Sequence, residues 1–119
     1  VINSSDRNAK NSIADIDEKY DTLFDGLRAR LYRYNDGTSG RLHSGFVAQE
    51  VEEAMQAANV PTSDFAAFCV DGAGTDKERR GLRYEEFVSL NTWQIQKLKT
   101  HLREVENRLA ILEKMKTGG

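Results

Sequence analysis

Apolar residues recur at intervals of three or four in three stretches of the chain, and each stretch predicts an amphipathic helix. The first spans residues 12–27, where Asp15 is placed to cap the start and Gly26 to end the helix. The second spans residues 47–58 and stops before the only proline. The third, residues 84–116, contains no glycine or proline and is rich in Leu, Glu, Lys, Gln and Arg, so it predicts one long helix.

Between these helices lie four short stretches that are typical of β-strands and are separated by Gly-, Asn- and Asp-rich turns. They are residues 28–34, 41–47, 65–70 and 81–83. The pattern therefore predicts an α+β fold: a small globular domain of short strands and two short helices, followed by one long C-terminal coiled-coil helix. We divide the chain accordingly into an N-terminal segment with a processing site (1–11), a small α+β domain (12–83) and the long helix (84–119).

The long helix carries a narrow apolar seam with heptad spacing. The a positions are Ile95, Leu102 and Leu109, and the d positions are Leu98, Val105 and Leu112. In a parallel bundle the flanking g and e residues would pair as Gln94–Lys99, His101–Glu106 and Arg108–Glu113. None of these pairs is a like-charge clash, so charge favours parallel assembly. Packing of the helix onto its own domain is the alternative, and we rank it lower because such helices usually show a broader apolar stripe.

Composition supports an oligomer and excludes several kinds of partner. Of the 119 residues, 39% are hydrophobic and 30% are charged, which is polar for a single-core domain and favours a core completed by partner chains. A net charge of −2 leaves no basic surface for nucleic acid or for an anionic membrane, and no apolar run approaches the roughly 18 residues of a membrane span. One cysteine and two histidines offer neither a disulfide nor a metal site, and no motif indicates a cofactor.

The candidate chemistry lies near the N-terminus, where Ser5 is followed five residues later by Lys10. Serine and lysine form one of the known nucleophile and base pairs, although an exposed, flexible tail is the simpler interpretation of these residues alone. Five residues place two side chains on different faces of a helix and on opposite faces of a strand. Pairing therefore requires an irregular turn or a second surface, and the lysine must be desolvated to act as a neutral base. Ser4 is adjacent and is the second candidate nucleophile.

Three segments in order resemble one family: Ser-Asp-Arg at 5–7 with Lys10, the block Gly-Phe-Val-Ala-Gln-Glu-Val-Glu at 45–52, and Leu-Arg-Tyr at 82–84 before the long helix. The chain is similar, over nearly its whole length, to the intramolecular chaperone auto-processing domain at the C-terminus of bacteriophage tail spikes, endosialidases, tail fibres and neck appendages. The resemblance implies a homotrimer that templates folding of the upstream fibre and then severs itself by autoproteolysis, with Ser5 as nucleophile and Lys10 as general base.

The same resemblance implies action in the host cell cytoplasm during phage assembly, with release from the mature virion fibre after cleavage. A non-catalytic trimerisation module of a fibre or tail protein is the alternative function. A third interpretation is a self-processing domain of this type within a cellular transcription factor. The residues alone do not decide whether two, three or four helices associate.

Overall fold

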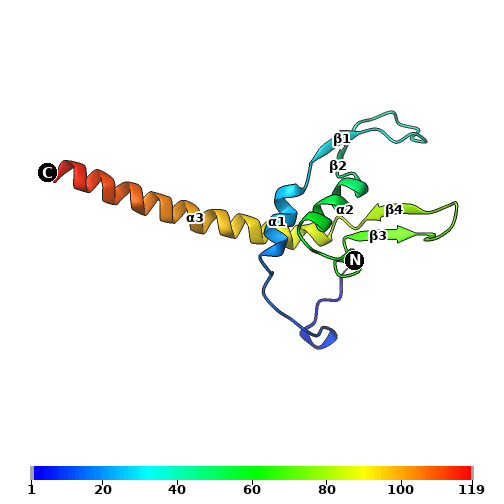
Figure 1. Ribbon diagram of the computed structural model, residues 1–119, viewed down its shortest axis with the longest axis horizontal. Helices are drawn as coiled ribbons and strands as arrows, with labels where there is room; N and C mark the ends of the chain where they lie inside the picture. Colours follow the sequence, from blue (N-terminus) through cyan, green and yellow to red (C-terminus); the bar gives the residue numbers. More distant parts are fainter. Residues whose placement is uncertain (1, 119) are drawn as a thin grey trace.

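The computed structural model describes residues 2–118, and Figure 1 shows a small body of helices and hairpins with one long helix projecting from it. In chain order the elements are η1 (Arg7–Ala9), α1 (Lys19–Gly26), β1 (Arg30–Tyr32), β2 (His43–Gly45), α2 (Ala48–Ala57), β3 (Phe68–Asp71), β4 (Arg79–Leu82) and α3 (Glu86–Thr117). The radius of gyration is 20.1 Å, whereas a compact domain of this length has about 13 Å. The predicted α+β fold with a long C-terminal helix is confirmed.

The four strands form two separate antiparallel hairpins. Strand β1 pairs with β2, with Leu31 opposite Ser44, and β3 pairs with β4, with Cys69 opposite Gly81. The first hairpin is shorter than the sequence predicts, since each of its strands has three residues. It projects from the body in Figure 1, and a two-stranded ribbon without a covering layer has little to hold its outer part in register.

One hydrophobic core lies where α1, α2, the base of the β3–β4 hairpin and the first turns of α3 meet. Its buried members are Leu23, Val51, Met55, Ala58, Val60, Ala67, Phe68, Phe87 and Leu90. Helices α1 and α2 contribute residues of the apolar stripes that their sequence spacing predicts, whereas α3 contributes Phe87 and Leu90 and none of its predicted seam. The core therefore includes only the beginning of α3.

The predicted first helix is wrong at its start and right at its end. Residues 12–18 are not helical, and Asp17, rather than Asp15, accepts a hydrogen bond from the backbone N of Lys19 (3.1 Å). The helical spacing continues upstream to Ile13, but that side chain is 67% exposed, so no packing stabilises an earlier turn. Gly26 is the last helical residue, and a Cβ there would lie 3.0 Å from the Cβ of Ala54. Close packing of α1 on α2 requires this glycine.

Candidate functional site

Ser5 and Lys10 are brought together by a single turn of 3-10 helix. The carboxylate of Asp6 caps this turn by accepting a hydrogen bond from the backbone N of Asn8 (2.8 Å). Lys10 follows in an extended conformation, and its backbone N donates to the carbonyl of Arg7 (3.1 Å). As a result, the Lys10 Nζ donates a hydrogen bond to the Ser5 Oγ over 2.7 Å. A regular helix or strand would keep these two side chains apart, and the capped turn η1 is the irregular turn that brings them together.

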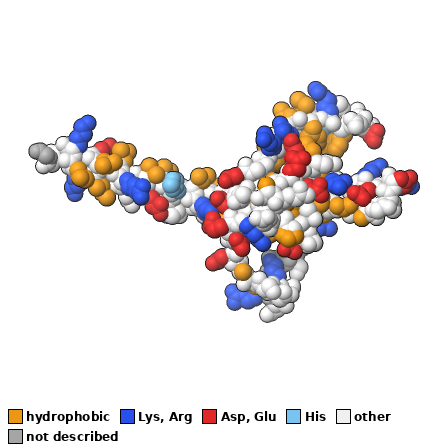
Figure 2. All heavy atoms as spheres, viewed as in Figure 1, with side chains coloured by type: hydrophobic (Ala, Val, Ile, Leu, Met, Phe, Trp, Pro, Cys, Tyr) orange, Lys and Arg blue, Asp and Glu red, His pale blue; other side chains and the backbone are white. Residues whose placement is uncertain are grey.

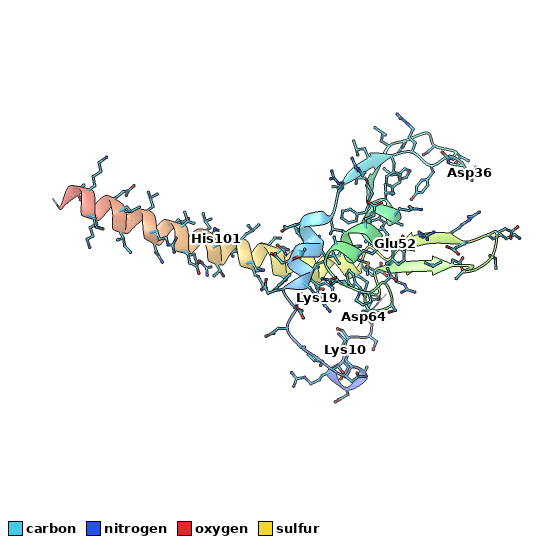
Figure 3. The ribbon with its side chains drawn as sticks, in the orientation of Figure 1. Lys10, Lys19, Asp36, Glu52, Asp64 and His101 are labelled. Atoms are coloured by element: carbon cyan, nitrogen blue, oxygen red, sulfur yellow. The ribbon has the colours of Figure 1, made fainter. Side chains whose placement is uncertain are left out.

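This pair lies on an exposed segment, away from the helices of the body. Both side chains are exposed, and Figure 3 shows Lys10 on the loop that precedes α1. Within residues 2–118, no hydrogen bond joins Ser4 to Lys10, so the geometry favours Ser5 over its neighbour as the partner of the lysine. The arrangement has the contact that a nucleophile and a base need, but the single chain does not shield it from water.

The block at 45–52 forms the junction between β2 and α2, and Tyr84 holds it. The Tyr84 Oη accepts a hydrogen bond from the backbone N of Phe46 (3.1 Å) and donates one to the carbonyl of Phe46 (3.3 Å). A Cβ at Gly45 would lie 2.5 Å from this hydroxyl, so the glycine leaves room for it. Two of the segments that carry the family resemblance are therefore in direct contact. Sequence reasoning missed this role of Tyr84, because the partners are 38 residues apart and no local pattern links them.

A second contact anchors the β1–β2 hairpin to the same block. The guanidinium of Arg30 donates to both carboxylate oxygens of Glu50, at 3.0 and 2.8 Å, and this pairing holds the pKa of Glu50 below its usual range. The Tyr32 hydroxyl lies 3.4 Å from that of Tyr34, and the pKa of Tyr32 is raised by this contact first and by Tyr84 second. The hairpin thus has a fixed base and an exposed outer part.

We expect Gly45→Ala to destabilise the domain by about 1–3 kcal/mol, because the new methyl group displaces the Tyr84 hydroxyl from its two hydrogen bonds. Thermal unfolding followed by circular dichroism measures this effect. Gly81→Ala is the matched control, since a Cβ at Gly81 meets no atom within 4 Å. Equal losses in the two variants would contradict the assigned role of Tyr84.

A polar joint connects α1 to α3. The Nε2 of Gln94, a side chain only 8% exposed, donates to the Oδ1 of Asp21 over 2.8 Å. Lys97 Nζ lies 3.3 Å from the same carboxylate oxygen and 2.9 Å from the Oε2 of Glu18. Hydrogen bonds from Gln94 first and Lys97 second hold the pKa of Asp21 below its usual range. These contacts fix the direction in which α3 leaves the body.

The lowered pKa of Asp21 makes the joint sensitive to acid. A carboxylate whose pKa is lowered by folding contributes stability above its unfolded pKa, near 3.9, and this contribution is lost as the pH falls through the folded value. We expect the melting temperature of the wild-type chain to exceed that of Asp21→Asn at pH 7, and this difference to disappear as the pH approaches 2. Asp36→Asn, at the tip of the first hairpin (Figure 3), should show no such difference. A gap between wild type and Asp21→Asn that is independent of pH would refute the assignment.

The predicted seam of α3 has no partner in the described chain. Its six residues are between 46% and 66% exposed, and Figure 2 shows hydrophobic side chains along the projecting part of the helix. Phe87, Leu90 and Gln94, which do pack on the domain, occupy g and c positions on one flank of the seam. The alternative in which the helix packs onto its own domain therefore describes only the first turns of α3. At 32 residues the helix is about 48 Å long, and most of it projects into solvent.

Other types of site have little support in the part of the chain that the structure describes. Across residues 2–118, no three His, Cys, Asp or Glu side chains cluster in a way that could hold a metal ion. None of the described helices combines the length and apolar character needed to cross a membrane.

Comparisons with known proteins give one family match and a similar solved structure. Residues 5–60 match the family model for peptidase S74, described as "Chaperone of endosialidase". A solved structure described as that of "a novel intramolecular chaperon" is similar with a TM-score of 0.58 at 18% identity, and the match covers 87% of this chain and 99% of that chain. At this identity the likeness shows the fold alone. No curated protein sequence matches the chain.

The fold is a small α+β body with a projecting helix, and residues 5–60 of it carry the family match. This family match covers 56 of the 119 residues. The resemblance stated from the sequence is thereby confirmed. The matched range includes Ser5, Lys10 and the block at 45–52, whereas Leu-Arg-Tyr at 82–84 and the long helix lie beyond it.

Proposed function

We propose that this domain is an intramolecular chaperone that forms a parallel homotrimer, templates the folding of an upstream phage tail spike or fibre, and then releases itself by autoproteolysis with Ser5 and Lys10. The observation that carries the catalytic part is the 2.7 Å hydrogen bond between Lys10 Nζ and Ser5 Oγ. The family match supports the chaperone part. On this proposal the domain acts in the host cell cytoplasm during assembly and is absent from the mature fibre.

The proposed trimer rests on the unpartnered seam. Six exposed apolar side chains at a and d positions, from Ile95 to Leu112, form a stripe that another copy of the helix can bury. The residues that dock α3 on its own domain occupy g and c positions beside the seam, and the six a and d side chains stay exposed, so self-association can bury the seam without removing Phe87 or Leu90 from the core. The number three comes from the family resemblance, and the parallel direction from the charge pattern beside the seam.

The proposed reaction is acyl transfer to serine followed by hydrolysis. The Ser5 Oγ attacks the carbonyl carbon of an adjacent peptide bond while Lys10 accepts the hydroxyl proton. The C–N bond breaks, the leaving amine takes that proton, and an ester to Ser5 remains. Water then attacks the ester, which yields a carboxylate and restores the Ser5 hydroxyl. No cofactor or metal is required, and each chain reacts once.

Assembly would supply what the single chain lacks. Ser5 and Lys10 are both exposed in the single chain, so water reaches both groups. Burial of the turn η1 against another subunit or against folded fibre would favour the neutral amine. On this account cutting follows assembly, which is the order that a folding template needs.

A C-terminal trimer also has a clear thermodynamic use. Bringing three separate long chains into register has a large entropic cost, and prior trimerisation makes pairing of the upstream segments intramolecular. After the fibre has folded, removal of the template makes the assembly irreversible in practice.

Mass spectrometry of a chain that carries its native upstream segment tests the proposal. The expected result is a trimer by light scattering that converts into two fragments whose masses place the cut beside Ser5. A trimer that never cleaves would support the second candidate, a non-catalytic trimerisation module, which the exposed seam alone also favours. A chain that remains single at all concentrations would exclude both.

A further inference from the structure

A groove between α1 and α3 opens directly beside the seam. Its volume is about 590 Å³, and its lining includes Asp21, Asp25, Gln94, Lys97, Leu98, His101 and Glu104. We call this surface the α1–α3 groove. Leu98 is a d residue of the seam, so the groove and the seam form one continuous surface on the same side of the helix.

The wall of the groove formed by α1 is acidic. Asp21 and Asp25 lie four residues apart on one face of α1, where like charges repel each other. Asp21 is neutralised by the polar joint to Gln94 and Lys97. Asp25 is exposed and forms no ion pair with any residue that the structure describes. An additional cation placed at this wall would therefore be favourable.

When a second copy docks in a parallel coil, heptad geometry places a lysine of that copy at the acidic wall of the groove. Gln94 and His101 are g residues, and α1 covers this flank of α3, as the Gln94–Asp21 hydrogen bond shows. In a parallel coil the g flank of one helix faces the e flank of its neighbour, with Gln94 opposite Lys99 of the neighbouring copy. Arg103, at the next b position, lies on that same flank. Lys99 is exposed and, among residues 2–118, has no ion pair within its own chain.

We infer that the α1–α3 groove is an inter-subunit docking site, in which Asp25 of one copy pairs with Lys99 of the next copy, so that α1 takes part in assembly. This inference rests on the proposed parallel trimer and adds to it a contact outside the coiled coil. The occupant is a second copy of this chain, since its e flank has the charge and the position that the groove requires. The pairing also favours one direction and one register, because an antiparallel neighbour would not place Lys99 beside Asp25.

A charge-swap cycle tests the inference, with the trimer dissociation constant of the 119-residue chain measured by sedimentation equilibrium. Lys99→Glu and Asp25→Lys should each weaken assembly roughly tenfold to a hundredfold, because three copies of the contact are lost together. The double swap should restore at least about tenfold of this loss. Adding 1 M salt should shrink the single-variant effects, since it screens exposed charges. Lys114→Glu, at an outward f position, is the control and should leave the constant unchanged.

The outcomes separate this inference from the proposed function. A wild-type trimer in which the two single effects simply add overturns the groove contact and leaves the trimer standing. A wild-type chain that is single at every concentration overturns both. The double variant with Asp25→Asn and Lys99→Glu is a second test of the contact, and it adds no positive charge to α1. It should strengthen assembly relative to Lys99→Glu alone, and an unchanged constant would count against the contact.

Discussion

Replacing Leu102 by aspartate should reduce the assembled protein to single chains and, with them, stop self-cleavage. Leu102 lies at the centre of the seam and is 56% exposed in the single chain, so its present surroundings tolerate the change. In a trimer, however, three carboxylates would meet in one apolar layer without partners. Loss of three buried leucines alone should weaken association by at least about a thousandfold. Light scattering behind a sizing column should show three times the chain mass for the wild type and one for Leu102→Asp.

Ile111→Asp is the matched control for this prediction. Ile111 is on the same helix, is 58% exposed and has the same apolar character, but it occupies a c position outside the seam. We expect it to leave assembly and cutting intact. If both variants dissociate, the exposed helix as a whole drives association, and the heptad assignment is wrong.

The second large effect concerns the pair Ser5 and Lys10. In a chain with its native upstream segment, Ser5→Ala should remain trimeric and uncut, because no nucleophile is left to form the ester. Lys10→Ala should slow cutting by at least about a hundredfold, since the general base is lost. Lys10→Arg should be equally slow, because arginine keeps the positive charge and hydrogen-bond donors but does not give up its proton. Intact mass measured over time gives all three rates.

Ser4→Ala is the control for the nucleophile and should cut at the wild-type rate. Cutting of Ser5→Ala at the same bond, together with loss of cutting in Ser4→Ala, would transfer the role to Ser4. The wild-type rate should be first order in assembled protein and insensitive to dilution. It should also rise with pH, because only a neutral amine accepts the proton. Dilution that slows the rate in proportion to concentration would instead indicate cutting between separate molecules.

Elements that depend only on residue propensity and local spacing can be predicted from the sequence. The long helix needs only its propensity and the absence of glycine and proline, and its heptad seam can be read directly. The helix at 48–57 and the end of α1 at Gly26 also follow from local spacing. The start of α1 does not, because the spacing runs on to Ile13 and only packing, which is missing there, decides where the helix begins.

The sequence by itself predicted the pair Ser5 and Lys10, the α+β order of elements and the position of the seam, because each is a property of spacing along one segment. Only the tertiary structure decided that the capped turn η1 joins the pair, that Tyr84 holds the junction at Phe46, and that Gln94 and Lys97 lock α3 to α1. These contacts depend on geometry at atomic scale or on residues far apart in the chain, such as Asp21 and Gln94, 73 positions apart, which no periodicity connects. The same joint uses Gln94 and Lys97, at g and c positions beside the seam, so the a and d side chains from Ile95 to Leu112 remain exposed.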